Sequence, residues 1–413
     1  MPTPVPGGLY VDVTQRLGTI SPFVYGTNIG PWTGIPLDMQ DELKQARLTF
    51  LRFPGGSYGD ENDLRAYQID QFIAECRQLG AEPAISVRLI GGSPEYAAAV
   101  VRYANIDKKY NVRYWSIGNE PSLYDTRPNV DYDTQRYNTE WRSFATAMRK
   151  VDPSILLVGP DIHQFDEHGG PRDALGRYWM REFLLANGDL VDIVSFHRYP
   201  FPKQRTDPAP GIEELRANTV EWDRMIPALR SLIRETIGRD LPIAVTEINS
   251  NWTAVTGGEA TPDSFYNAIW WSDVLGRLIR QRVEIVAQFA IHGPAGQGWG
   301  LVESYEPRPS YYVYLLYRHF GDELIYASSD DPGVSIYAAR RGDGMLTLMI
   351  VNLASHAIEK QLTIDGLRPA PSAETWRLDR DHPAVQIDDT PMKKTSLLHL
   401  PAESVTLLVV QPE

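Results

Sequence analysis

The chain has 413 residues, of which 43% are hydrophobic and 23% charged, a balance that predicts a globular protein and excludes wholesale disorder. A formal net charge of −13 disfavours binding to nucleic acid or to an anionic membrane surface, so we expect neither as a partner. No run of about 18 apolar residues occurs, and no basic segment followed by an apolar one opens the chain. We therefore expect a soluble protein, secreted or cytoplasmic, with no signal peptide in the given sequence.

The N-terminal segment, residues 1–18, precedes a series of short apolar runs. Within it GLYVDVTQ, from Gly8, could add a strand to a β domain elsewhere in the chain. Eight apolar runs follow, each ending in polar or glycine-rich residues, as the strands of a buried parallel sheet do. They are FVYGTNIG from Phe23, FLRFPGG from Phe50, PAISVRL from Pro83, VRYWSIGNEP from Val112, ILLVGPDI from Ile155, DIVSFHRYP from Asp192, PIAVTEINS from Pro242 and EIVAQFAIHG from Glu284.

Helical segments separate these runs. Residues 63–80 carry apolar side chains at three- and four-residue spacing, and the order Ser93, Pro94, Glu95 is typical of a helix start. Strict alternation of strands and helices predicts a parallel sheet with helices outside it, and eight such units predict a closed (β/α)8 TIM barrel over residues 19–322. No GxGxxG motif follows the first strand, which argues against a doubly wound dinucleotide-binding sheet.

The pattern changes at the end of the chain. From residue 323 onward, short segments such as VSIYAARR, LTLMIVNLA and SVTLLVV alternate with Gly, Asp and Pro. Period-two patterning between such turns predicts a C-terminal antiparallel β-sandwich domain over residues 323–413.

The carboxyl ends of the barrel strands are where catalytic groups are expected. Two glutamates stand there, Glu120 after the fourth strand and Glu247 after the seventh. Retaining glycosidic cleavage needs one carboxylic acid to protonate the leaving oxygen and one carboxylate to attack the anomeric carbon, about 5 to 5.5 Å away. Because the two strands lie on roughly opposite walls of a narrow barrel, the glutamates could approach that spacing.

The two glutamates differ in their sequence neighbours. Glu120 stands close to Trp115, Ile117 and Pro121, and this apolar setting would raise its pKa and suit it to be the acid. We expect Glu247 to stay ionised.

The motifs around both glutamates resemble those of a known group of enzymes. WSIGNEP (115–121) and VTEINS (245–250), with LRFPGG and SFHRYP in their places, are similar to the strand ends of clan A retaining glycoside hydrolases, and the trailing β domain resembles that of families 39, 51, 79 and 44. The resemblance implies that Glu120 is the acid/base and Glu247 the nucleophile. Further roles implied in this way are a bond from Asn119 to the sugar 2-hydroxyl, orientation of Glu247 by Arg52 and Tyr199, and a place for His197 in the same pocket.

The expected substrate is an oligo- or polysaccharide of plant or microbial origin, and arabinofuranosides, xylosides, glucuronides and β-linked glucans all stay open. Trp32, Trp252 and Trp299 follow strands one, seven and eight, where an indole ring could stack on a sugar or simply pack a loop, and Trp299 is the preferred platform. Arg88 could pair with a uronic carboxylate or with a structural partner. No cofactor is expected.

Two readings from other classes remain open. Asp161 and His163 begin a loop, DIHQFDEHGG, whose acidic and histidine side chains suggest a metal-dependent barrel hydrolase, although HExxH spacing is absent and no metal is expected. A non-catalytic glycan-binding protein could keep the same fold. Arg52, Tyr199 and His197 could likewise belong to a structural network rather than to a substrate site.

Overall fold

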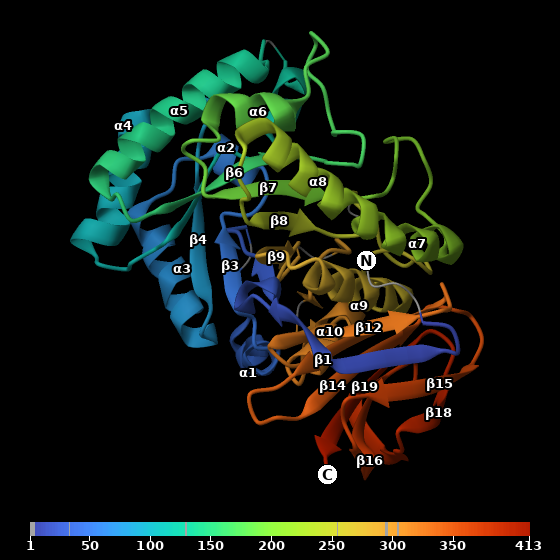
Figure 1. The fold of residues 1–413 in the computed structure, drawn as a ribbon. Coiled ribbons are helices and arrows are strands. Elements are labelled where there is room, and N and C mark those ends of the chain that lie inside the picture. The colour runs from blue at the N-terminus through green and yellow to red at the C-terminus, as the bar shows by residue number, and fades with distance from the viewer. Residues whose placement is uncertain (1–4, 33, 129, 254, 294–295, 304) are drawn as a thin grey trace.

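A computed structural model describes residues 5–413 except residues 33, 129, 254, 294–295 and 304, so that residues 1–4 of the N-terminal segment lie outside the described part. The described chain forms a closed barrel surrounded by helices and a nine-stranded, mostly antiparallel sheet beside it (Figure 1). The predicted barrel followed by a β domain is confirmed.

The barrel closes on eight parallel strands, in sequence order, and β9 pairs with β2. Their bounds are β2 Gly26–Asn28, β3 Phe50–Phe53, β4 Glu82–Val87, β5 Tyr114–Ile117, β6 Leu156–Ile162, β7 Ile193–Arg198, β8 Ile243–Ile248 and β9 Ile285–Gln288. Seven lie within the apolar runs of the sequence, and β4 begins one residue before its run, at Glu82.

The barrel interior is built in layers, because successive side chains of a strand point to opposite faces. Its apolar floor consists of Phe50, Ala84, Tyr114, Val158, Ile193, Ala244, Ile285 and Ala287. Two residues further along five of these strands, the same face carries buried polar side chains, namely Arg52, Ser86, Ser116, Ser195 and Thr246. The interior therefore changes from apolar to polar toward the carboxyl ends of the strands.

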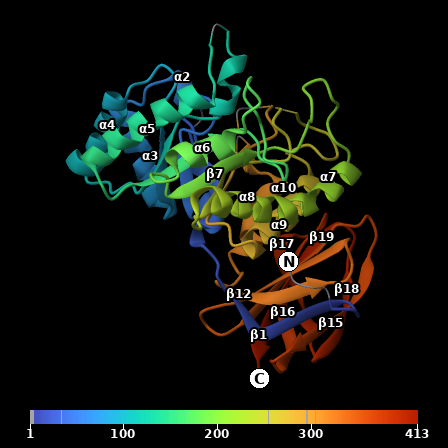
Figure 2. The ribbon, with the colours of Figure 1, turned by 45° about the horizontal axis from the view of Figure 1, so that its top comes forward.

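Helices cover the outside of the barrel (Figure 2). Ser93 caps α4 as its sequence predicted, since its hydroxyl accepts a hydrogen bond from the backbone nitrogen of Tyr96 at 3.2 Å. The helices are α1 Gln40–Gln45, α2 Tyr58–Glu61, α3 Ala66–Leu79, α4 Pro94–Val101, α5 Thr134–Val151, α6 Trp179–Asn187, α7 Ile212–Asn218, α8 Trp222–Ile237, α9 Phe265–Arg280 and α10 Pro309–Tyr317. A short hairpin of β10 Val302–Glu303 and β11 Glu306–Pro307 lies between β9 and α10. No helix among the described residues has the length and apolar character needed to cross a membrane.

The β domain joins both ends of the chain. Its strands run in the order β17, β16, β19, β14, β13, β12, β1, β15, β18. Their bounds are β1 Leu9–Thr19, β12 Glu323–Ser329, β13 Val334–Arg340, β14 Leu346–Asn352, β15 Ile358–Asp365, β16 Pro369–Leu378, β17 Pro383–Pro391, β18 Thr395–Leu400 and β19 Ser404–Pro412. Pairing is antiparallel except between β1 and β15, which run parallel.

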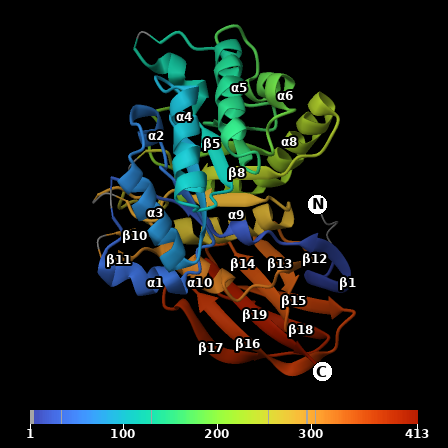
Figure 3. The ribbon, with the colours of Figure 1, turned by 90° about the vertical axis from the view of Figure 1, so that its left-hand side faces the viewer.

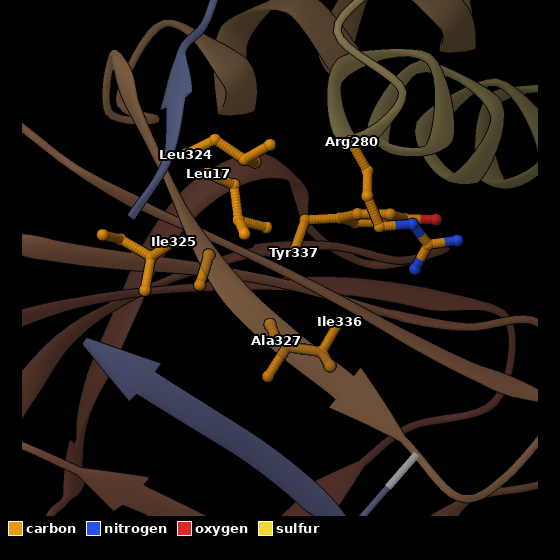
Figure 4. Close-up of a pocket in the computed structure, with 8 residues that line it drawn as sticks. Leu17, Arg280, Leu324, Ile325, Ala327, Ile336 and Tyr337 are labelled. Carbon is orange, nitrogen blue, oxygen red and sulfur yellow. The ribbon is translucent and has the colours of Figure 1, made fainter. Parts of the chain in front are cut away.

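One face of this sheet is packed against the barrel through α9 and α10 (Figure 3). Buried Tyr337, Met349 and Leu407 from β13, β14 and β19 belong to the same apolar core as the helices of the barrel. Figure 4 shows a gap in this contact, a cavity of about 10 Å³ beside Leu17, Tyr337 and Arg280, which has room for about one water molecule. The two parts therefore share a nearly continuous packed interface.

Candidate active site

The carboxyl ends of β5 and β8 bring Glu120 and Glu247 together. One side-chain ligand atom each from Glu120, Glu247 and His197 lies within 4.8 Å of the other two. Glu247 is 3% exposed, whereas the Glu120 side chain is 20% exposed. Glu120 is therefore the more accessible to solvent of the two glutamates.

A sharp turn places Glu120. Gly118 has a φ of +81°, and a Cβ there would lie 2.9 Å from the Cβ of Leu89, so a side chain does not fit. Glu120 itself has a φ of +49°, a region that non-glycine residues rarely adopt. Its backbone nitrogen donates to the carbonyl oxygen of Asp161 at 3.0 Å, and this bond helps to hold the unusual conformation.

Three donors surround the carboxylate of Glu247. Arg52 Nη1 and the backbone nitrogen of Gly56 both donate to Oε1 at 2.8 Å. The hydroxyl of Tyr199 donates to Oε2 at 2.9 Å. An ionised carboxylate has only acceptor sites, so this set of donors matches the ionised form and fixes its orientation.

Arg52 connects several groups of the site. Its side chain is 1% exposed and, besides Glu247, Nη1 donates to Asn28 Oδ1 at 3.0 Å. Nη2 donates to Asn119 Oδ1 at 2.9 Å and to Asp161 Oδ2 at 3.2 Å. Burial opposes its charge, but the charges of Asp161 and Glu247 outweigh burial and raise the pKa of Arg52.

Glu120 and His197 form a coupled pair. His197 Nδ1 lies 3.0 Å from Glu120 Oε1 and 3.6 Å from Glu247 Oε2. Burial raises the pKa of Glu120, but the hydrogen bond and the charge of His197 lower this pKa by more than burial raises it. The net shift is therefore downward. Burial lowers the pKa of His197, but Glu247 and Glu120 outweigh burial, so its net shift is upward.

The expectation that apolar neighbours raise the pKa of Glu120 is therefore wrong for the free protein. Trp115 and Ile117 belong to the core between strands and helices, because alternation along β5 turns them away from the barrel interior. The side chain that contacts Glu120 is the imidazole of His197, which the sequence neighbours of Glu120 do not reveal.

A buried carboxylate supports the turn from outside. Asp60 Oδ2 accepts hydrogen bonds from the backbone nitrogen of Asn119 at 3.0 Å and from the hydroxyl of Tyr124 at 2.5 Å. Burial raises the pKa of Asp60 to about 6. The segment from Asn119 to Tyr124 is thus fixed at both its backbone and a side chain.

Aromatic rings lie beside Glu247. Phe289 lies just after β9. The centroid of its ring is 6.4 Å from the ring centroid of Tyr199, 6.2 Å from that of Trp32 and 5.5 Å from that of Trp299. Trp299 is half-buried, and its Nε1 donates to the carbonyl oxygen of Asn251 at 2.8 Å.

Two other candidates lie apart from this cluster. Trp252 is 37% exposed and is anchored instead to the carbonyl oxygen of Pro202. Arg88 donates through Nε to the backbone carbonyls of Asp60 and Ile90, which is the structural role weighed for it.

The loop that begins at Asp161 does not gather metal ligands. His163 Nδ1 lies 2.8 Å from Ser122 Oγ, Glu167 pairs with Arg224, and Asp161 pairs with Arg52. Within the described ranges, the one group of three or more side chains close enough to hold a metal ion is Glu120, His197 and Glu247.

Five members of the site were missed from the sequence. They are the Gly56 amide, the Phe289 ring, Asn28 and Asp161 as partners of Arg52, and Asp60 as the support of the turn. Phe289 follows the eighth predicted strand and could have been selected on that ground. A backbone donor such as Gly56 leaves no signal in the identity of a side chain.

Comparison with known proteins places the chain among carbohydrate-cleaving enzymes. A family model described as glycosyl hydrolases family 39 matches residues 96–349. Heparanase from Bos taurus is 25% identical over 270 residues, which cover 62% of this chain and 46% of that protein. A β-xylosidase from Geobacillus stearothermophilus is 25% identical over 273 residues, covering 59% and 47%. The chain spans about half the length of these curated relatives.

Solved structures share the whole architecture. An α-L-arabinofuranosidase from Thermotoga maritima, in complex with arabinose, aligns with a TM-score of 0.79 at 19% identity over 98% of this chain and 99% of that one. A family 44 xyloglucanase from Paenibacillus polymyxa aligns with a TM-score of 0.76 at 15% identity, covering 98% and 99%. At these identities the likeness is one of fold.

Proposed function

Because the chain belongs to family 39 of the glycosyl hydrolases and is therefore a glycoside hydrolase, we propose that it cleaves its glycan with retention of anomeric configuration. The observation that carries this proposal is the closeness of Glu120 and Glu247, with side-chain atoms within 4.8 Å. Retaining enzymes need about 5 to 5.5 Å between the carboxyl groups, whereas inverting enzymes leave about 6.5 to 9.5 Å for a water molecule. This short separation of the nearest oxygens supports the retaining arrangement.

In the proposed first step, Glu247 attacks the anomeric carbon while Glu120 protonates the leaving oxygen. The carbon–oxygen bond to the leaving group breaks as a bond to a Glu247 oxygen forms. In the second step Glu120 removes a proton from water, the water oxygen attacks the same carbon, and Glu247 leaves as a carboxylate. Glu120 recovers its proton in this way.

His197 supplies the proton that the first step requires. Glu247 and Glu120 raise the pKa of His197, whereas the hydrogen bond and charge of His197 lower the pKa of Glu120, so the pair favours a proton on the imidazole. Glu120 must be protonated to act as an acid, and His197 Nδ1 is 3.0 Å from it. Transfer of the proton from His197 to Glu120, as the substrate displaces water, would give Glu120 the protonated form that the first step needs.

The remaining residues position the reacting groups. Arg52 and Tyr199 hold both oxygens of Glu247. Since the Asn119 oxygen is already bonded to Arg52, its amide nitrogen is the group left to donate to the sugar 2-hydroxyl. Trp299, beside Phe289, offers an apolar wall for the sugar ring.

The proposed substrates are plant or microbial glycans with arabinofuranosyl, xylosyl, glucuronosyl or β-linked glucosyl units. Support comes from the names of the similar proteins, which include a β-xylosidase and a structure of an α-L-arabinofuranosidase. The measurement is hydrolysis of a panel of nitrophenyl glycosides and polysaccharides, in the presence of EDTA, by wild type, Glu120→Gln and Glu247→Gln. We expect turnover by wild type alone, and a first-formed product with the anomeric configuration of the substrate by NMR.

The same experiment separates the other two classes of function. Activity that is lost with EDTA and restored by a divalent metal would favour a metal-dependent hydrolase built on Glu120, His197 and Glu247. Glycan binding by isothermal titration without turnover would favour a binding protein. Full activity of both glutamine variants would refute the proposed carboxylate pair.

A further inference from the structure

We propose that Asp161 is a positioning residue that holds Arg52 and the turn of Glu120 in one fixed arrangement. The inference rests on the proposed roles of Glu120 and Glu247, and it assigns a function to a buried carboxylate that touches neither the sugar nor the reacting atoms. Asp161 lies at the end of β6, between β5 and β7 in the barrel.

The Asp161 carboxylate is held from three strands and is 1% exposed. Oδ2 accepts from Arg52 Nη2 on β3 at 3.2 Å. Oδ1 accepts from Thr246 Oγ1 on β8 at 2.6 Å and from Ser195 Oγ on β7. Thr246 directly precedes Glu247, so one Asp161 oxygen is tied to the strand that bears the proposed nucleophile.

The Asp161 backbone reaches the other half of the site. Its carbonyl oxygen accepts from the backbone nitrogen of Glu120 at 3.0 Å. Asp161 also has a left-handed φ of +52°, a strained conformation that its side-chain and backbone bonds maintain. Asp161 is thus linked to Glu247 through Arg52, and to Glu120 through the backbone nitrogen of Glu120.

The charge of Asp161 also enters the balance of the site. One guanidinium, that of Arg52, serves two buried carboxylates, Asp161 and Glu247. His197 from β7 interacts electrostatically with Asp161 as well, and Glu120 lies at the end of β5. Removing the Asp161 charge leaves Arg52 with one buried carboxylate partner, Glu247, and takes a negative charge away from His197. The loss of that negative charge lowers the pKa of His197.

The test is the variant Asp161→Asn, which keeps the size of the side chain. We expect kcat/KM to fall about 10- to 100-fold, mainly through kcat, because the loss affects alignment in the transition state. The pKa of His197, followed by NMR of the imidazole nitrogens in the free protein, should also fall, and this readout needs no substrate.

The matched control is Asp273→Asn, which removes another fully buried aspartate paired with an arginine, here Arg277 at 2.8 Å in α9. It should lower Tm while leaving kcat, the pH profile and the His197 pKa as in wild type. A folded Asp161→Asn protein that matches wild type in kcat and in the His197 pKa would overturn the inference. It would leave the proposed function intact, since that depends on the Glu120→Gln and Glu247→Gln variants.

A second variant covers the case in which Asp161→Asn does not fold. Thr246→Val is nearly isosteric and removes only the hydroxyl that donates to Asp161 Oδ1. It should lower kcat by about 3- to 10-fold, because one hydrogen bond to a buried carboxylate is lost, with KM little changed. An unchanged kcat in this variant would overturn the inference.

Discussion

Among the described residues, the hydroxyl of Tyr199 is the only hydrogen-bond donor to Glu247 Oε2, whereas two donors share Oε1. Its removal therefore leaves one carboxylate oxygen without a fixed partner. Tyr199→Phe should lower kcat by about 10- to 100-fold, since a hydrogen bond to a charged group contributes about 1.5 to 3 kcal/mol. Steady-state kinetics on the best glycoside of the panel measure this. An unchanged kcat would show that the phenol does not orient the nucleophile.

The pair of Glu120 and His197 makes stability depend on pH in a defined window. The folded pKa of Glu120 is below its ordinary 4.5, so its contribution is present above pH 4.5 and is lost as pH falls through the folded value. The folded pKa of His197 is above its ordinary 6.5, so its contribution is present below pH 6.5 and is lost as pH rises through the folded value. Both contributions to stability are therefore fully present between pH 4.5 and pH 6.5.

Calorimetry of wild type and Glu120→Gln over a pH series checks this linkage. The Tm of wild type minus that of the variant should rise as pH increases toward 4.5, stay level to 6.5, and decrease above it as His197 loses its proton. A difference that does not vary with pH would contradict the assigned protonation states.

At the level of single residues, the sequence predicted which side chains form the site better than it predicted their electrostatics. Strand ends pointed to Glu120 and Glu247, the family resemblance added Arg52, His197 and Tyr199, and these side chains do lie together. The electrostatics of Glu120 were misjudged because neighbours in sequence along a strand point to opposite faces. The contact between Glu120 and His197 depends on the position of β7 along the barrel relative to β5 and β8. A single sequence does not specify this relative position.

At the level of elements, the helix α9 determines how the sheet docks on the barrel. A Cβ on Gly276 would lie 2.3 Å from the ring of Tyr337. Alanine normally stabilises a helix interior by about 0.5 to 1 kcal/mol over glycine, but overpacking of this kind costs about 1 to 3 kcal/mol. Gly276→Ala should therefore lower Tm, measured by calorimetry, while kcat at moderate temperature stays near that of wild type.

Gly342 provides the matched control for that substitution. A Cβ at Gly342 meets no atom within 4 Å, and its φ lies outside the left-handed region. Gly342→Ala should leave Tm unchanged or raise it slightly. A similar drop in Tm for both alanine variants would show that contact with Tyr337 is not the cause.

The elements themselves were the most predictable part of the protein. Each buried strand of the barrel stands out as an apolar run, because both of its faces are covered. The parallel pairing of β1 with β15 was not foreseen, since it joins Leu9 to Leu362 and no local pattern encodes a partner that distant in the chain. Long-range pairing is decided by the packing of the whole sheet.

At the level of the whole molecule, the barrel and the sheet share one apolar core. A chain that ends at Phe320 would expose the surfaces of α9 and α10 that now cover Tyr337, Met349 and Leu407. It would also leave β1 without β12 and β15. We expect this truncated barrel to aggregate, because apolar surface of that extent is not tolerated on a monomer. Size-exclusion chromatography and dye binding measure this, and a monodisperse barrel with full activity would contradict it.

The position of β1 has a consequence for synthesis on the ribosome. Its two partners are translated roughly 300 residues later, which takes about 15 to 60 s at about 5 to 20 residues per second. During that time β1 has neither of its partners, because the barrel strands lie between them in the sequence. β1 can therefore enter the sheet only after β12 and β15 have been made.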